Sequence, residues 1–141
     1  MFLIESTPLG TKENPLTEKD KLKNPSLNGI LNPWGLTIGD DVVVDMENYV
    51  GADVGCPVTR NYPHHKEIVN GLDYTFYIRP RSISMLPNHR STIKMAPLVF
   101  TASKKNSWAE TDKTLQVKYN EKEDILGPVS VAAVVWEPKN Q

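Results

Sequence analysis

The sequence GDDVVVD at residues 39–45 sets three consecutive valines between a polar turn and an aspartate. A strand that is buried on one face alternates apolar and polar residues, whereas a continuous β-branched run is typical of a strand buried on both faces. The stretch 129–136 is a second strong strand candidate, introduced by Gly127-Pro128 and ended by Pro138. These two strands predict an α/β fold, in which a parallel sheet is layered with flanking helices.

The other expected elements are arranged around these two strands. A helix with one apolar face is expected from a cap at Asn24-Pro25 to the breakers Pro33 and Gly35, and this face would dock on the sheet. Further expected elements are strands at 74–79, 95–102 and 115–119, a short helix at 68–72, and a turn or short helix at 83–86.

The N-terminal part of the chain has a different character. The apolar run Phe2-Leu3-Ile4 is not preceded by a turn, and such a run is either an edge strand or a strand of a longer domain. Residues 5–23 mix two prolines and a glycine with polar and charged residues, so we expect an exposed loop there. The whole chain, residues 1–141, is expected to form a single α/β domain.

Length and composition exclude several classes of protein. The chain has 141 residues, with 16 basic and 17 acidic side chains and a net charge of −1. This near-balance argues against a nucleic-acid partner, because binding to phosphates uses an excess of positive charge. The longest apolar stretch, residues 129–136, is too short to span a bilayer. A single cysteine excludes an internal disulfide.

Cys56, His64 and His65 lie in one proline-bounded loop and are the first residues to consider for catalysis. A cysteine nucleophile needs a nearby base to form the thiolate, and histidine is the usual base. No strand-turn-helix signature places this thiol at an exposed elbow, so we expect no catalytic residue. A cysteine-dependent hydrolase or amidotransferase relative is a further alternative function.

Metal binding has no clear sequence signature. His64 and His65 are adjacent, and adjacent side chains point in different directions on most backbones. The carboxylates of Asp40, Asp41 and Asp45 lack the spacing and the central glycine of a calcium loop. We expect these aspartates to lie in a solvated turn, and we expect neither a metal ion nor a cofactor.

Two segments are candidates for ligand binding. Arg79 and Arg81 flank Pro80 at the end of an expected strand, where two guanidinium groups suit an anion; solvent-facing arginines are the alternative. Trp108 belongs either to the core or to a binding cleft, where its ring would suit a saccharide.

The segment around Trp108 also allows two local structures. If it is extended, the carboxylates of Glu110 and Asp112 share one face and could serve acid–base chemistry. If it is helical, Ser107 and Glu110 have the three-residue spacing of a capping box. Both interpretations stay open from the sequence.

The unbroken string NSWAETD at residues 106–112 resembles a segment of the GldG-like family. Members of that family are extracytoplasmic auxiliary proteins of gliding-motility and related ABC-type transport systems. Other segments resemble the motifs of the family in the same order, although Lys66 stands where the family often has proline. These segments are residues 26–36, 39–45, 62–68, 78–83 and 126–129.

The resemblance implies a flavodoxin-like parallel sheet related to class I glutamine amidotransferases, present here in part, within a larger membrane-anchored protein. It implies a non-catalytic binding or coupling role toward permease or ATPase subunits of an ABC transporter, or toward another membrane protein, on the extracytoplasmic (periplasmic) face of the cytoplasmic membrane. A small-ligand or saccharide receptor is the alternative function. The candidate ligand-binding residues are Arg79, Arg81, Ser82, Trp108, Glu110 and Thr111.

Overall fold

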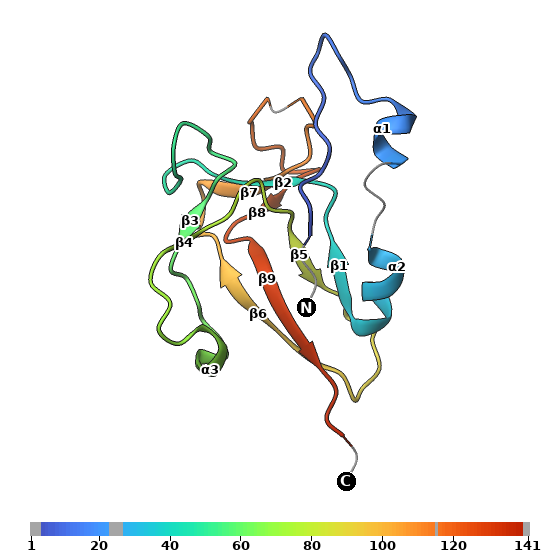
Figure 1. The fold of residues 1–141 in the computed structure, drawn as a ribbon, viewed down its shortest axis with the longest axis vertical. Coiled ribbons are helices and arrows are strands. Elements are labelled where there is room, and N and C mark those ends of the chain that lie inside the picture. Colours follow the sequence, from blue (N-terminus) through green and yellow to red (C-terminus); the bar gives the residue numbers. More distant parts are fainter. Residues whose placement is uncertain (1–3, 23–26, 115, 140–141) are drawn as a thin grey trace.

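The computed structural model describes residues 4–22, 27–114 and 116–139. Its helices are short, and long loops join many of its strands (Figure 1). The helical elements are α1 (Glu18–Leu22), α2 (Asn28–Leu31), the 3-10 helix η1 (Asn32–Trp34) and α3 (Lys66–Val69). The strands are β1 (Leu36–Ile38), β2 (Val42–Asp45), β3 (Val58–Thr59), β4 (Thr75–Phe76), β5 (Ile83–Met85), β6 (Lys94–Phe100), β7 (Ser107–Glu110), β8 (Ile125–Leu126) and β9 (Ser130–Trp136).

Every strand pairing within the described residues is antiparallel. β1 pairs with β5, β3 with β4 and β6 with β9, while β7 lies between β2 and β8. The predicted α/β fold with a flavodoxin-like parallel sheet is therefore wrong. The chain instead forms small antiparallel sheets of two or three strands, and its short helices lie at the periphery (Figure 1).

The valine run of β2 explains the error in the predicted fold class. Val42 and Val44 pack on one face of the strand with Trp108, and Val43 packs on the opposite face with Ala109. The strand is thus buried on both faces, as its sequence indicates. The cover comes from neighbouring strands and loops instead of helices, and a continuous apolar run does not distinguish these two environments.

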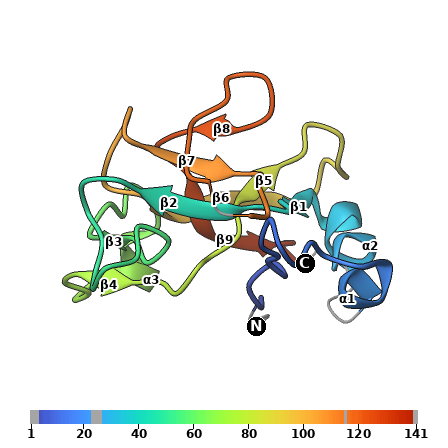
Figure 2. The same ribbon diagram turned by 90° about the horizontal axis from the view of Figure 1, so that it is seen from above.

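The longest ladder joins β6 to β9. Its register runs from Lys94 opposite Trp136 to Phe100 opposite Ser130, with irregular pairing after Pro97, which has no amide hydrogen to donate. β5 packs against β9, so β1, β5, β9 and β6 lie side by side, with β2, β7 and β8 gathered at one end of them (Figures 1 and 2). The strands predicted at residues 95–102 and 129–136 are confirmed by β6 and β9.

Several expected elements take a different form. The helix expected up to residue 35 is divided between α2 and η1, and its cap at Asn24-Pro25 lies outside the described residues. Residues 83–85 form β5 and not a turn or short helix, because they pair with β1 along its whole length. The segment 74–79 is a strand only over β4, and 115–119 contains no strand in its described part. Elements of two to four residues are too short for periodicity to decide their form.

The N-terminal segment lies along the sheets. Phe2-Leu3 of the expected first strand is outside the described residues, but Ile4 packs against a buried apolar cluster built by α2 and β1. In the described part of the expected loop, residues 5–22 are irregular apart from α1, and Thr7 within them is buried. Its hydroxyl donates a hydrogen bond to the Asp40 carboxylate, which attaches this segment to the turn before β2.

Candidate functional site

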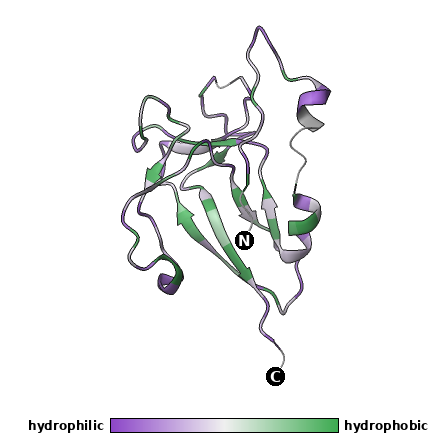
Figure 3. Cartoon of the chain, viewed as in Figure 1, coloured by the Kyte–Doolittle hydropathy of each residue, from purple (hydrophilic) through white to green (hydrophobic). Residues whose placement is uncertain are grey.

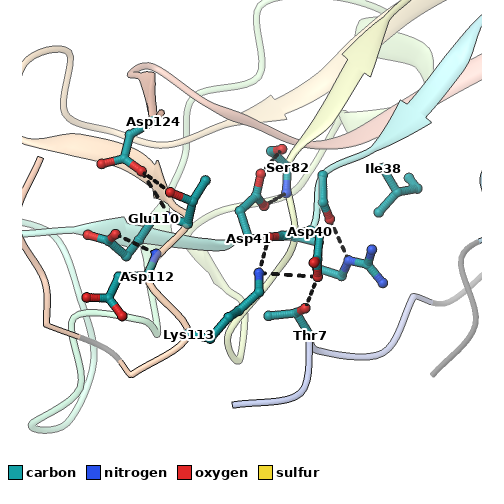
Figure 4. Close-up of polar contacts among 12 residues, drawn as sticks. Thr7, Ile38, Asp40, Asp41, Ser82, Glu110, Asp112, Lys113 and Asp124 are labelled. Atoms are coloured by element: carbon teal, nitrogen blue, oxygen red, sulfur yellow. Dashed lines mark hydrogen bonds and ion pairs between the residues drawn. The ribbon is translucent and has the colours of Figure 1, made fainter. Parts of the chain in front are cut away.

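Asp41 and Ser82 form the first polar contact of the candidate site (Figure 4). The turn between β1 and β2 brings the Asp41 carboxylate to the start of β5, where it accepts hydrogen bonds from the Ser82 amide at 2.8 Å and the Ser82 hydroxyl at 2.6 Å. Gly39 fits this turn because a Cβ there would lie 2.2 Å from the Ser82 Oγ. Arg81 donates from Nε to the Gly39 carbonyl at 2.7 Å. Both Arg81 and Ser82 are buried and engaged within the protein.

The two aspartates of this turn lie in different electrostatic environments. Burial raises the pKa of the Asp41 carboxyl above its ordinary value of 3.8, although the hydrogen bonds from Ser82 act in the opposite direction. Partial burial also acts to raise the pKa of Asp40. Its hydrogen bond from Thr7 and the Lys113 ammonium group, 3.2 Å away, outweigh that effect and leave the pKa lowered. The solvated-turn expectation is wrong for Asp41 and for Asp45, which are both buried.

The opposite pKa shifts predict opposite pH dependences for two neighbouring substitutions. Because the folded chain binds the Asp41 proton more tightly than the unfolded chain, the contribution of Asp41 to stability falls as pH rises from 3.8 through its raised folded pKa. Relative to wild type, Asp41→Asn should therefore gain stability as pH rises. Relative to wild type, Asp40→Asn should lose stability as pH rises through the acid range. The pKa of Asp40 is lowered in the folded chain, so its charged form stabilises the wild type and the variant lacks that gain.

Urea denaturation of the wild type and both variants, at neutral pH and at a pH below 3.8, measures these differences. The expected result is two slopes of opposite sign against pH. Parallel slopes, or an Asp41→Asn variant whose relative stability rises on acidification, would contradict this account of the turn.

Trp108 and Glu110 lie on the same face of β7, because alternate residues of a strand share a face. The indole N–H of Trp108 donates to the Glu110 carboxylate at 2.9 Å, and both residues are buried, Trp108 with an exposed fraction of 7%. Its ring also packs edge-on against Tyr119, with 6.0 Å between ring centroids. Trp108 is thus a core residue, and the capping-box interpretation of Ser107 is wrong since this segment is extended.

The carboxylates after Trp108 organise the backbone of the next loop. Glu110 accepts hydrogen bonds from the amides of Asp112 at 2.9 Å and Lys118 at 3.1 Å, in addition to the indole. Thr111 donates from its amide and its hydroxyl to Asp124, at 3.0 and 2.8 Å. Asp112 in turn accepts hydrogen bonds from the amide and the hydroxyl of Thr114, both at 2.7 Å, so Glu110 and Asp112 each bind backbone of this loop (Figure 4). Thr111 is likewise engaged with the protein itself.

Arg79 and Arg81 do not converge on an anion site. The Nε of Arg79 lies 3.0 Å from the Asp53 carboxylate, whereas Arg81 turns to the Gly39 carbonyl. Partial burial acts to raise the pKa of Asp53, but the Gly55 amide and the Arg79 guanidinium outweigh this effect and lower it. Arg79 also has a φ of 47°, a left-handed conformation that is uncommon for a residue with a side chain. Each arginine is thus directed to an acceptor of its own.

Cys56 and the neighbouring histidines have separate partners. The half-buried thiol hydrogen-bonds the Asp53 carboxylate, which favours the charged form of that carboxylate. The ring of His65 packs edge-on against Trp136 of β9, with 4.9 Å between ring centroids. Within the described residues, no hydrogen bond joins Cys56 to His64 or His65, so the structure does not show a thiol–imidazole pair.

An apolar groove, which the sequence did not predict, lies between the β1–β5 pair and β9. The groove has a volume of about 610 Å³, and hydrophobic residues gather on the strands and on α2 around it (Figure 3). Its described lining contains no charged side chain and consists of Ile4, Ile30, Leu31, Trp34, Leu36, Ile38, Ile83, Ala133, Val134 and Val135. Four separate segments supply these residues, so no local motif in the sequence indicates the groove.

Over residues 4–22, 27–114 and 116–139, no helix is long and apolar enough to cross a membrane. The same part of the chain holds no group of three or more histidine, cysteine, aspartate or glutamate side chains able to bind a metal ion. The chain matches none of the known protein families, characterised proteins or solved structures with which it was compared. The resemblance to the GldG-like family stays a prediction.

Proposed function

We propose that this chain is a non-catalytic binding and coupling domain of an ABC-type transport system, which docks through its apolar groove on a permease subunit at the extracytoplasmic face of the membrane. The observation that carries the proposal is the groove, which is open and has no charged residue in its described lining. The assignment to a transport system rests on the ordered sequence motifs that resemble the GldG-like family.

The groove has the composition of the central part of a protein interface. Such interfaces have an apolar centre depleted of charge and a polar rim that water reaches. Ile30 and Trp34 at the groove are 56% and 37% exposed, which is more than a core position allows. Arg90 lies 5.2 Å above the Trp34 ring and pairs with Glu137 at 3.3 Å, so a charged pair borders the apolar lining. An apolar surface of a partner would remove these side chains from water.

The residues of the GldG-like motifs have a structural role, which leaves the groove as the surface for binding a partner. Ser82, Trp108, Glu110 and Thr111 all make internal hydrogen bonds. Among the described residues, no buried side-chain nitrogen or oxygen lacks a partner, so none of them points an unsatisfied group at a ligand. Trp108 also offers no open ring face to a saccharide, since the ring is buried.

Purification of the full-length protein from its native membranes in mild detergent tests the proposal. Mass spectrometry of the co-purified proteins should show a permease subunit of an ABC transporter enriched over a purification from membranes that lack the tagged protein. Recovery of the protein without any ABC permease or ATPase subunit would contradict the assignment to a transport system.

A further inference from the structure

The sequence contains two Asn-Gly pairs in different environments. Asn70-Gly71 follows α3, and both residues are exposed. Asn28-Gly29 lies within α2, and the Asn28 side chain is partly buried. Asn-Gly is the dipeptide in which the backbone nitrogen of the second residue most easily reaches the side-chain amide of the first, because glycine has no side chain to hinder the approach. The structure therefore offers one reactive site and an internal control.

We propose that Asn70 is a site of spontaneous deamidation in the folded protein and that Asn28 is not. The Gly71 backbone nitrogen, after losing its proton to hydroxide, attacks Cγ of Asn70 and forms a new N–C bond. The bond between Cγ and the side-chain nitrogen breaks, and this nitrogen takes a proton from water and leaves as ammonia, which regenerates the hydroxide. Solvent water then opens the five-membered succinimide ring at either carbonyl and gives aspartate or isoaspartate. No oxidant or reductant takes part.

The turn at Asn70 leaves the attacking nitrogen accessible. Asn70 has φ −62° and ψ 135°, and Gly71 has φ 80°, which are the central angles of a type II β-turn. The turn is closed by the Leu72 amide, which donates to the Val69 carbonyl at 3.2 Å. The Gly71 amide is not the donor of this turn, and apart from Gly71 and its two chain neighbours no atom lies within 4 Å of the position that a Cβ on Gly71 would occupy. Ring closure requires rotation about the Cα–C bond of Asn70 from this ψ, and in this exposed turn the hydrogen bond from the Leu72 amide to the Val69 carbonyl is the contact that opposes the rotation.

Asn28 is held in place by the backbone of β1. Its side-chain nitrogen donates to the Ile38 carbonyl at 3.1 Å, and its side-chain oxygen accepts from the Ile38 amide at 2.7 Å. These two hydrogen bonds fix the amide plane away from Gly29. The helical conformation of α2 also keeps the backbone from rotating into the ring geometry. Ring closure at Asn28 therefore requires local unfolding of α2 and its contact with β1.

Deamidation at Asn70 changes the surface at the end of α3. It adds a carboxylate beside the exposed apolar side chains of Ile68 and Leu72, and isoaspartate also lengthens the main chain by one atom within the turn. This face becomes more negative and more polar with time, without any enzyme.

Peptide mapping by mass spectrometry after incubation of the folded chain at neutral to mildly alkaline pH tests the proposal. The expected result is conversion at Asn70 at least about tenfold faster than at Asn28, since local opening limits the second site. In denaturant the two sites should react at similar rates, because the same dipeptide is then free in both places. A variant Asn70→Gln should remove the fast conversion and leave the slow one unchanged.

Two results would overturn the proposal. One is a folded chain in which Asn70 reacts as slowly as Asn28. The other is a difference between the two sites that persists unchanged in denaturant, since the neighbouring sequence and not the fold would then set the rates.

Discussion

Replacing Asp45 by alanine is expected to lower the free energy of unfolding by about 3 kcal/mol, since each buried donor left without a partner costs about 1–3 kcal/mol. Asp45 is fully buried at the end of β2. Its carboxylate accepts hydrogen bonds from the amides of Glu47, Asn48 and Ser103 and from the Ser103 hydroxyl, at 2.7–3.0 Å. Alanine removes the acceptor and leaves these donors without it. The loss is a large part of the roughly 5–15 kcal/mol that stabilises a typical domain.

Chemical denaturation of the chain measures this change, and Asp73→Ala is the matched control. Asp73 has an 83% exposed side chain and a 3.8 Å ion pair with Arg60, so its removal should change stability by less than about 1 kcal/mol. Asp45→Asn, which keeps one acceptor oxygen, should lie between wild type and Asp45→Ala. Equal stability of Asp45→Ala and Asp73→Ala would refute the role given to this carboxylate.

The second large effect is expected for Glu110→Ala, which should cost about 2–3 kcal/mol because a hydrogen bond to a charged group contributes about 1.5–3 kcal/mol. Glu110 binds the indole of Trp108 and the amides of Asp112 and Lys118. Its loss leaves the buried indole N–H unpaired and detaches the loop after β7. Glu121→Ala, an exposed residue of a following turn, should change stability by less than about 0.5 kcal/mol.

A double-mutant cycle separates the indole contact from the rest of this effect. Trp108→Phe removes the N–H, so the two substitutions share one interaction and should be non-additive, with a coupling free energy of about 1–2 kcal/mol. Additive effects of Trp108→Phe and Glu110→Ala would show that the two side chains do not stabilise each other. In that case the structural role assigned to this pair fails.

The fold could be predicted only in part, and β2 shows where the limit lies. The three valines correctly predicted a strand buried on both faces, and the apolar run at 129–136 correctly predicted β9. Neither pattern shows whether the neighbouring strand runs parallel or antiparallel. Direction depends on long-range pairing, such as that of Val44 with Trp108, and the side chains themselves do not reveal it.

The candidate site shows the same limit at the level of side chains. The sequence drew attention to Trp108 and Glu110, and the two are indeed in contact, because extended backbone puts alternate residues on one face. It did not show that they bond to each other instead of to a ligand. Arg79 and Arg81 are two residues apart as well, but their acceptors, Asp53 and the Gly39 carbonyl, come from distant segments. Partners supplied by the tertiary fold cannot be inferred from local spacing.

Side chains of the segments that resemble GldG-like motifs make hydrogen bonds within the protein. Asp41 binds Ser82, which ties the turn before β2 to the start of β5. Trp108 binds Glu110, and Thr111 binds Asp124, which fixes the loop between β7 and β8. These hydrogen bonds stabilise the fold, and those of Asp41 and Thr111 join segments that are distant in the sequence. The open apolar groove is accordingly the surface that we assign to partner binding.

The central claim, that the groove binds the partner, is tested most directly by comparing two variants of the full-length protein. Ile30 on α2 lines the groove and is 56% exposed, and Ile68 on α3 is 53% exposed and does not line it. In Figure 1 the two helices lie on opposite sides of the molecule. Because both positions are helical and similarly exposed, Ile30→Glu and Ile68→Glu should have similar effects on folding, which a thermal melt checks.

The deciding measurement is the amount of permease subunit that co-purifies from membranes with each variant. The account predicts that Ile30→Glu lowers recovery at least about tenfold, because burying an unpaired carboxylate in an apolar interface costs well over 1.4 kcal/mol. Ile68→Glu should leave recovery close to that of the wild type. Equal recovery with both variants, both being folded, would contradict the claim that the groove is the docking surface.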